Sequence, residues 1–558
     1  MPKATVSKQD EGSDDVSIID DGSLHFTAEG GANSTQLTYQ EASGAPIEVN
    51  SPLGYSVGYV TVVFLNLSKM IGTGVFTTPN PSPSIPQHQP FSTELAPWVS
   101  VYSTGSSGTW LPRSYPRPKY FFPTVFAMQT VLFSFSSSNA VVLAQYLFKL
   151  AESEASDWQL KGVAVASYSV AFLVLVFNTK WSLHLANAIG FVKLITLIFI
   201  GITGLVVLGG NVSAIPDSKI NFRNAFEGTS AATVYGATNA LVKVMFSYKG
   251  YENAFNVVNE VRNPVKTLRW SAPVSLTLTA TLYMLANIAY FTSASKDEIL
   301  KSKIGVASLF FEKVFGTSGA SRALNFLICL SAFGNLIAVL IGQSRVLREC
   351  GRQGVLPFTG FWTSTRPFGT PLGPYTLKWA LTVIMILAPP AGDAFNFVVD
   401  LSMYPATAFD FLLAIGLLFT RYHRKRLNFP KSGYRAWDIA VCFAILSNLY
   451  LLVAPWYPPL GGATGGDVSF WYGTYLVVGI AIIGVCGVYY YVWIKILPKM
   501  GGYEFRQTIL KMEGGATAHK LVKVPNDHLE SWDAEHDAAG RLRHRGVRAN
   551  SAELGKPV

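Results

Sequence analysis

Long apolar runs separated by short polar segments occupy most of the chain. Most runs approach the roughly 20 residues that a helix needs to cross a bilayer. The first covers about 55–79, and ten more follow at about 120–148, 162–177, 184–209, 231–258, 271–294, 321–347, 376–390, 394–420, 437–455 and 470–497. The pattern predicts an all-α membrane protein with about 11–12 transmembrane helices.

Polar segments border this region. Residues 1–52 hold two lysines and nine acidic residues, and their composition predicts a disordered acidic cytoplasmic tail. Residues 53–497 form the predicted transmembrane domain, and residues 498–558 a cytoplasmic C-terminal tail with a short helix near 527–538. Inside the transmembrane domain, the charged segment 295–316 predicts a short amphipathic helix on the surface.

Composition and charge narrow the class of protein. Of the 558 residues, 49% are apolar and only 14% charged, which excludes an ordinary soluble protein. The net charge of +10 does not indicate nucleic acid, because much of it lies in short loops that orient membrane helices. The four cysteines lack CxxC spacing, and no nucleophile–base pair, metal cluster or phosphate loop stands out. We therefore expect no cofactor, no metal and no enzyme activity.

The stretch KMIGTGVFTTP, at 69–79, lies at the end of the first run. Gly72 and Gly74 disfavour a continuous helix, so we expect a break that frees backbone N–H groups. In lipid, a break is tolerated where the backbone lines a polar cavity, and freed N–H groups can hold a carboxylate. Close packing of helices also explains a Gly-x-Gly inside a span.

A second interruption lies in FSYKGYENAFNVVNEVRNP, residues 246–264. Lys249 and Gly250 follow an apolar helix here, and a charge inside a span is costly unless it lines a cavity. Unwinding frees C=O groups, which accept hydrogen bonds from an ammonium. Transporters with inverted repeats place broken helices at equivalent positions of their halves, so the pair of breaks predicts a site for the zwitterionic end of an amino acid.

Three motifs resemble the amino acid–polyamine–organocation superfamily: GTGVF at 72–76, FSYKGYENAFNVVNEVRNPVKTL at 246–268 and GQSRVLRECGRQGVLP at 342–357. Within it, the chain resembles the L-type amino-acid transporter branch, and there the fungal high-affinity methionine permeases. The resemblance covers about 52–79 and 115–497. It implies a five-plus-five inverted-repeat fold with two additional helices.

The function that this resemblance implies is a secondary-active permease. Such a protein imports neutral amino acids, including methionine-like ones, by alternating access and proton-coupled symport. It lies in the fungal plasma membrane, and basic loops at 262–269, 345–366 and 421–435 predict that both tails are cytoplasmic.

The resemblance also implies site residues. Amides of the first break would hold the substrate carboxylate, carbonyls of the second its ammonium, and the Phe246 ring would gate the outside. Lys249 replaces a glycine common in animal members, so we expect its side chain to point away. The substrate-binding residues predicted in this way are Gly72, Thr73, Gly74, Val75, Phe246, Ser247, Tyr248, Lys249 and Gly250.

Lys193 lies in the middle of LANAIGFVKLITLIFIG. A lysine inside a span marks a functional site unless it snorkels to an interface. Lys193 matches the fifth-helix lysine that, in sodium-independent relatives, takes the place of a coupling sodium ion, so we assign it to ion coupling. Residues that could line the cavity, relay protons or simply pack helices are Ser134, Ser136, Ser137, Ser138, Asn139, Ser331, Asn335, Asp400, Tyr404 and Asp410.

One segment departs from the family. Residues 80–114 contain six prolines and no run long enough to cross a bilayer, where the family has its second helix. YPRPKYFFP, at 115–123, resembles the turn after that helix. A retained intron or a shifted reading frame explains the replacement, as does a genuine defective variant. Both explanations put transport by the written chain in doubt.

Two other functions fit the same pattern. A receptor that senses an amino acid without net transport needs the same pocket, although neither tail contains a recognisable signalling domain. A carrier of another substrate such as polyamines keeps the fold, although Lys249 disfavours a cationic ligand. All three have a small molecule and the lipid bilayer as partners, and none has nucleic acid.

Overall fold

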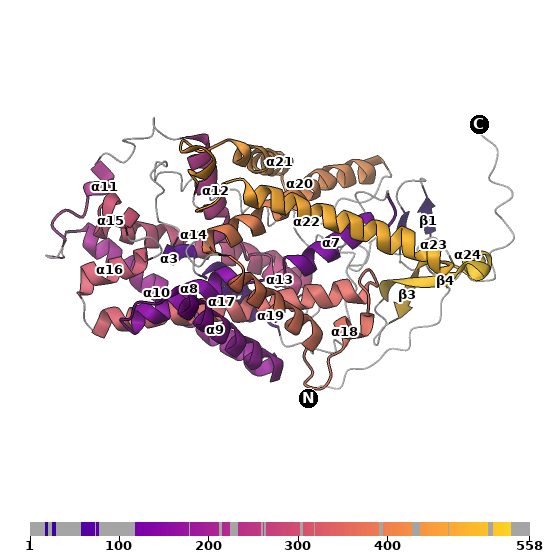
Figure 1. The fold of residues 1–558 in the computed structure, drawn as a ribbon, viewed down its shortest axis with the longest axis horizontal. Helices are drawn as coiled ribbons and strands as arrows, with labels where there is room; N and C mark the ends of the chain where they lie inside the picture. Colours follow the sequence, from indigo (N-terminus) through magenta and orange to yellow (C-terminus); the bar gives the residue numbers. More distant parts are fainter. Residues whose placement is uncertain are drawn as a thin grey trace.

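The computed structural model is almost entirely helical (Figure 1). Eight of the described helices are long and apolar enough to cross a membrane, and two shorter apolar helices accompany them. This confirms the prediction of an all-α membrane protein. The structure describes residues 17–20, 25–28, 57–72, 74–77, 118–177, 179–210, 212, 215–223, 233–257, 260–261, 264–301, 305–316, 319–389, 394–426, 436–466, 468–511 and 517–536.

The helices follow the predicted apolar runs in two halves, each of which begins with a broken helix. The first half contains α2 (Tyr59–Met70), α3 (Gly74–Thr77), α7 (Phe121–Leu132), α8 (Ser137–Leu150), α9 (Asp157–Phe177) and α10 (Thr179–Leu208). The second contains α12 (Val234–Tyr248), α13 (Asn253–Asn256), α14 (Pro264–Ser293), α17 (Gly319–Arg352), α19 (Leu372–Leu387) and α20 (Ala394–Arg426). The additional helices are α21 (Asp438–Val453) and α22 (Thr474–Tyr490).

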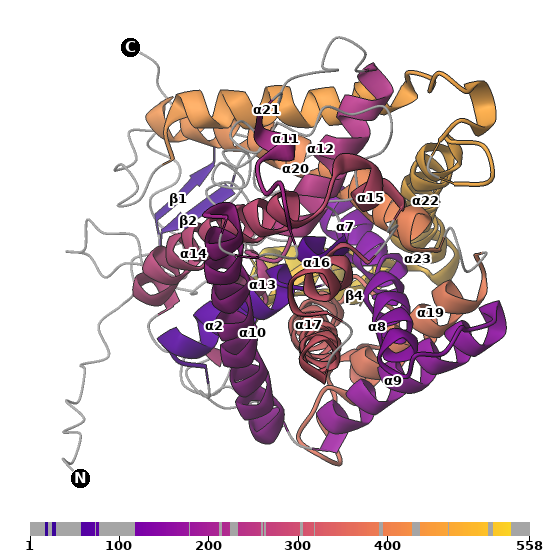
Figure 2. The same ribbon diagram turned by 90° about the vertical axis from the view of Figure 1, so that its left-hand side faces the viewer.

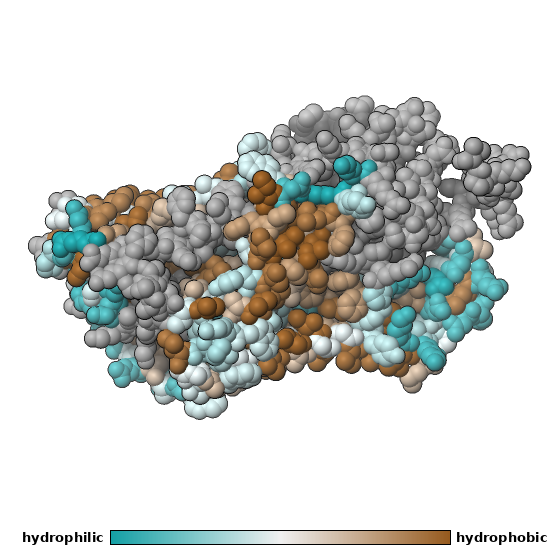
Figure 3. Space-filling model, turned by 90° about the horizontal axis from the view of Figure 1, so that it is seen from above, coloured by the Kyte–Doolittle hydropathy of each residue, from teal (hydrophilic) through white to brown (hydrophobic). Residues whose placement is uncertain are grey.

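Helix α17 is the centre of the bundle (Figure 2). In its most apolar window 78% of the residues are buried, against 17% for the window of α22 at the edge. It packs against α2, α8, α9 and α10, so its side chains can contact the first broken helix, to which α2 belongs. Figure 3 shows apolar side chains across the middle of one face and hydrophilic ones near both ends, as expected for a molecule that spans a bilayer.

Two local expectations need correction. The segment 295–316 forms two helices, α15 (Lys296–Lys301) and α16 (Val306–Phe315), and not one surface helix. The second is largely buried, because Phe310 and Phe311 pack into the main core. The second apolar run, at 120–148, is also interrupted, since residues 133–136 separate α7 from α8. A run of serines marks this break in the sequence.

Some predictions concern residues outside the described part. The segment 80–114, with the replaced second helix, lies there entirely. Within the predicted acidic tail, the described residues are two short antiparallel strands, β1 (Ser17–Asp20) and β2 (His25–Ala28). Nothing here therefore tests the predicted domain boundaries.

A hairpin and a short helix between residues 503 and 535 fold back onto the bundle. Strands β3 (Tyr503–Lys511) and β4 (Thr517–Pro525) form an antiparallel hairpin, followed by α24 (Leu529–Glu535). Leu521 donates its N–H to the carbonyl of Gln353, which lies just beyond α17, at 3.0 Å. Gly354 has a φ of +76°, and a Cβ there would lie 2.6 Å from the Leu521 carbonyl oxygen, so the contact requires glycine.

Candidate functional site

The first break lies between α2 and α3. Helix α2 ends at Met70, residues 71 and 72 are not helical, and α3 begins at Gly74. Thr73, between them, lies outside the described residues. A Cβ on Gly72 would lie 2.5 Å from Nδ2 of Asn335, so only glycine lets α17 approach this closely. The predicted unwinding at the Gly-x-Gly is therefore present.

Side chains from three other helices bind the carbonyl groups at this break. Such groups at a helix end have no partner within the helix, and lipid offers none. Lys193 Nζ, from α10, donates to the carbonyls of Ser68 at 2.9 Å and Ile71 at 2.7 Å. The remaining donors are Asn335 to Ser68 (3.1 Å) and Lys69 (2.5 Å), Ser331 to Ile71 (3.4 Å) and Tyr283 to Met70 (2.6 Å).

The second break lies between α12 and α13. Helix α12 ends at Tyr248, and residues 249–252 form a turn before α13 begins. Lys249 donates its N–H to the carbonyl of Phe246 at 3.1 Å, and Asn253 donates to the carbonyl of Gly250 at 3.0 Å. Gly250 has a φ of +140°, which side chains rarely tolerate. The predicted unwinding is again present, but it begins at Lys249, so Ser247 and Tyr248 still belong to α12.

The two breaks touch. A Cβ on Gly74 would lie 2.8 Å from Ser247 Oγ and 3.1 Å from its Cα. A Cβ on Gly250 would lie 2.8 Å from the nitrogen of Met70. Two predicted glycines are therefore the points at which the broken helices meet, and the structure brings the two predicted stretches together.

An ion pair joins the breaks on one side. Glu252 accepts from Lys69 Nζ at 2.6 Å and from the Gly250 N–H at 2.8 Å. The side chains of Lys69 and Glu252 are 10% and 25% exposed, so the pair is largely removed from solvent. Neither was singled out from the sequence. The only sequence feature that could have indicated this ion pair is the presence of one charged residue beside each break, with opposite signs.

The Lys249 side chain extends toward α20. Its Nζ lies 3.8 Å from the sulfur of Met403, and its charge interacts with Glu252 and Asp410. Asp410 forms no ion pair with any residue that the structure describes. The side chain thus extends toward α20, while its carbonyl stays in the turn.

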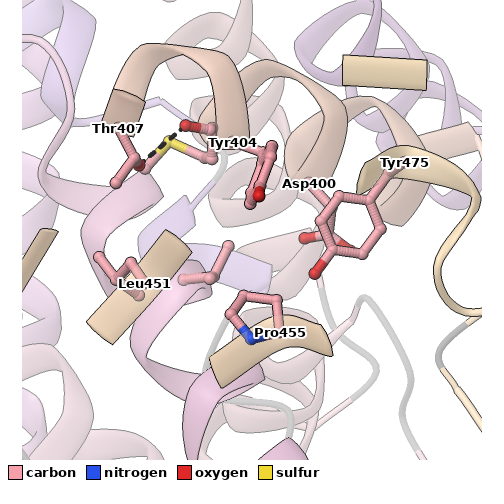
Figure 4. A pocket seen from close by; sticks show the side chains of 8 residues that line it. Asp400, Tyr404, Thr407, Leu451, Pro455 and Tyr475 are labelled. Atoms are coloured by element: carbon pink, nitrogen blue, oxygen red, sulfur yellow. Dashed lines mark hydrogen bonds between the residues drawn. The ribbon is translucent and has the colours of Figure 1, made fainter. Parts of the chain in front are cut away.

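A small pocket lies beside α12 and against α20, α21 and α22 (Figure 4). Asp400 and Tyr404 line it, together with Met403. Asp400 accepts from Lys243 Nζ at 2.9 Å, so this carboxylate is paired, whereas sequence could not distinguish it from Asp410. Tyr404 donates to the carbonyl of Leu452 at 3.2 Å. Through Met403 the pocket adjoins the second break.

The serine-rich break between α7 and α8 contacts α19 and not the two glycine-containing breaks. The N–H of Ser136 donates to Thr382 Oγ1 of α19 at 3.1 Å, which ties this segment to its neighbours. Asn139 does approach the first break, since its Oδ1 would lie 3.3 Å from a Cβ on Gly72. The buried members of the predicted set are Ser134, Ser136, Ser137, Ser138, Ser331, Asn335, Asp400 and Tyr404. Among the described residues, no group of His, Cys, Asp or Glu side chains could hold a metal ion.

Comparisons with known proteins point to one family. The model of a family described as "Amino acid permease" matches residues 57–483. The chain is 36% identical to the high-affinity methionine permease of Saccharomyces cerevisiae, over 79% of this chain and 76% of that protein. It is 27% identical to the low-affinity methionine permease of the same yeast, over 85% and 89%. It is 25% identical to the b(0,+)-type amino acid transporter 1 of Mus musculus, over 72% and 82%.

Proposed function

This chain belongs to the amino acid permease family, and from that premise we propose that it imports neutral amino acids, including methionine and related sulfur-containing ones, by proton-coupled alternating access. Membership makes it a multi-pass membrane protein that transports amino acids and not an enzyme. The finer substrate class takes its support from the two similar methionine permeases. The plasma membrane, with both tails cytoplasmic, is the location we propose.

The substrate site in this proposal is the contact between the two breaks. Amides of Gly72–Val75 bind the carboxylate, and carbonyls at 246–250 bind the ammonium. The approach of Gly74, the first residue of α3, to Ser247, in the last turn of α12, is the observation that carries this assignment, because it brings the ends of the two broken helices together. Of the second-break carbonyls, Phe246 already accepts one bond from Lys249, and a carbonyl oxygen can accept a second.

Lys193 is the ion-coupling residue in this proposal. Its Nζ lies where backbone carbonyls converge at the end of α2, and a cation is favoured at the C-terminal end of a helix. A lysine that can release and regain its proton there would tie the state of the first break to protonation. The replaced second helix at 80–114 stays a prediction, and so does its effect on transport.

Gly74→Val tests the site. A branched side chain would collide with Ser247 and separate the two breaks, so we expect uptake of labelled L-methionine to be abolished while the protein still reaches the cell surface. Gly484→Val, on α22, is the matched control, because a Cβ there meets nothing within 4 Å. Saturable uptake by Gly74→Val at the wild-type rate would contradict the assignment. Absence of uptake by wild type and control alike would contradict the transport proposal for this chain.

A further inference from the structure

One carboxylate inside the bundle has no partner among the residues that the structure describes. Asp410 lies midway along α20, is half-buried, and forms neither an ion pair nor a hydrogen bond with any of them. Other carboxylates inside the bundle form ion pairs at 2.6 to 2.9 Å: Glu252 with Lys69, Glu260 with Arg345 and Asp400 with Lys243. An unpaired carboxylate at membrane depth is costly, and proton pathways are built from such groups.

Two charged groups act on Asp410, and both belong to the turn of the second break. They are the Lys249 ammonium and the Glu252 carboxylate. Lys249 Nζ lies 3.8 Å from the sulfur of Met403, which precedes Asp410 by seven residues on α20. Seven residues make about two helical turns, so Met403 and Asp410 share one side of α20. The Lys249 ammonium therefore lies along the side of α20 that carries the unpaired carboxylate.

The other helices packed against α20 bring no further charge to Asp410. These helices are α8, α12, α21 and α22. Their titratable side chains are Tyr146, Lys149, Tyr235, Lys243, Tyr248, Asp438, Cys442, Tyr450, Tyr475, Cys486, Tyr489 and Tyr490. Of the two lysines, Lys243 is paired with Asp400, and Lys149 lies over the Tyr146 ring. Within the described part of the chain, the charge of Asp410 thus responds only to the turn.

The turn can change its shape independently of α20. The N–H groups of Lys249 and Gly250 bond within the turn or to the last residues of α12, and none bonds to α20. A change in the turn therefore moves the Lys249 ammonium relative to Asp410. Burial favours the neutral form of a carboxylate, whereas a nearby cation favours the charged form. The position of Lys249 hence decides whether Asp410 holds a proton.

We propose that Asp410 is a proton-binding site that couples the second break to the proton gradient, with Lys249 as the positioning residue that controls it. The inference rests on the proposed proton-coupled function and goes beyond it, since it adds a second proton-binding group to Lys193, at the other break. When Lys249 withdraws, the Asp410 carboxylate takes a proton from water on one side of the membrane. When Lys249 returns, the carboxylic acid gives that proton to water on the other side.

Asp410→Asn tests the assignment in proteoliposomes. Asparagine keeps the shape of the side chain but cannot carry the proton. With an interior one pH unit more alkaline, we expect wild type to accumulate labelled L-methionine about tenfold, for one proton per substrate, and Asp410→Asn less than about twofold. Exchange of internal for external methionine needs no net proton movement, so the variant should keep an exchange rate within about threefold of wild type. A residue needed only for the fold would lose both activities.

Asp438→Asn is the control. Asp438 pairs with Arg421, and its side chain is 57% exposed, so the same substitution there should leave accumulation and exchange at their wild-type values. Lys249→Met gives an independent test if Asp410→Asn does not reach the membrane. Loss of the cation favours the protonated carboxylate, so the pH of half-maximal uptake should rise by about one unit, and Lys249→Arg should return it to the wild-type value.

Two results would overturn the inference. One is an Asp410→Asn variant that still accumulates methionine as wild type does, and the other is a Lys249→Met variant with an unchanged pH of half-maximal uptake. In both cases wild type is still driven by the gradient, so the proposed function would stand. Wild type that exchanges methionine but ignores the gradient would defeat proton coupling and the inference with it. Absence of both activities in wild type would defeat the proposed function itself.

Discussion

The two breaks occupy equivalent positions in their halves but are held in different ways. At the first, carbonyls of residues 68–71 receive donors from α10, α14 and α17. At the second, the backbone N–H groups of the turn bond within it, Lys249 to Phe246 and Gly250 to Glu252, and Lys69 of α2 pairs with Glu252. The carbonyls of the first break are therefore bound by side chains of surrounding helices, whereas the backbone N–H groups in the turn of the second break bond to residues of that same turn.

This difference suggests a division of roles. A segment whose bonds are local can change its shape without disturbing neighbouring helices, and a segment held by three helices can move only if they release it. We therefore expect alternating access to involve the first break through its anchors, and the second through rearrangement of the turn at 249–252. Substitutions at the anchors should then have larger effects than substitutions in the turn.

Lys193→Met should have the largest effect. It keeps the length of the side chain but removes two charge-assisted bonds to buried carbonyls, a loss of roughly 3 kcal/mol, which corresponds to about a hundredfold fall in uptake. Uptake of labelled L-methionine at several pH values is the measurement. Lys378→Met is the control, because that lysine is equally buried but binds Gln343 and neither break. Unchanged uptake and pH dependence in Lys193→Met would remove the lysine from the mechanism.

Glu252→Gln should have an intermediate effect. Glutamine can still accept from the Gly250 N–H but loses the ion pair with Lys69, so we expect uptake to fall about fivefold, the equivalent of about 1 kcal/mol. Glu298→Gln, which breaks the more exposed pair with Lys313, should leave uptake unchanged. A loss as large as that of Lys193→Met would show that the second break depends on its partner as much as the first does.

Lys249→Met should have the smallest effect. The side chain contacts Met403 and interacts with Asp410, while the proposed substrate contact is the backbone carbonyl, which the substitution keeps. We expect KM for L-methionine to stay within about twofold of wild type. A tenfold increase would mean that the ammonium group of Lys249 itself takes part in binding.

Local sequence patterns predicted the helices and both breaks, because each depends on residues close together in the chain. Apolar runs defined the spans, and Gly72, Gly74 and Gly250 marked the places where a helix is costly. The partners of the breaks were harder to find. Tyr283 lies in a helix of 30 residues with one other tyrosine, Tyr290, and nothing in that pattern selects the one that meets Met70.

Ion pairs and contacts between residues far apart in the sequence could not be predicted either. Asp400 and Asp410 flank the same stretch of α20, and only the fold shows that Lys243 pairs with the first. The hairpin at 503–525 was missed for a similar reason. Its strands are stabilised by packing of Phe505 and Leu521 against the far end of the bundle, and no local pattern specifies that contact.

The docked hairpin bears on how the protein is handled in the laboratory. Strand β4 is bonded to the turn after α17, and the Arg506 guanidinium binds both carboxylate oxygens of Asp533 in α24. Cutting the gene between codons 503 and 535 would therefore divide a folded unit and expose Phe505 and Leu521. Reporter fusions and shortened versions are better joined after Glu535, where α24 ends.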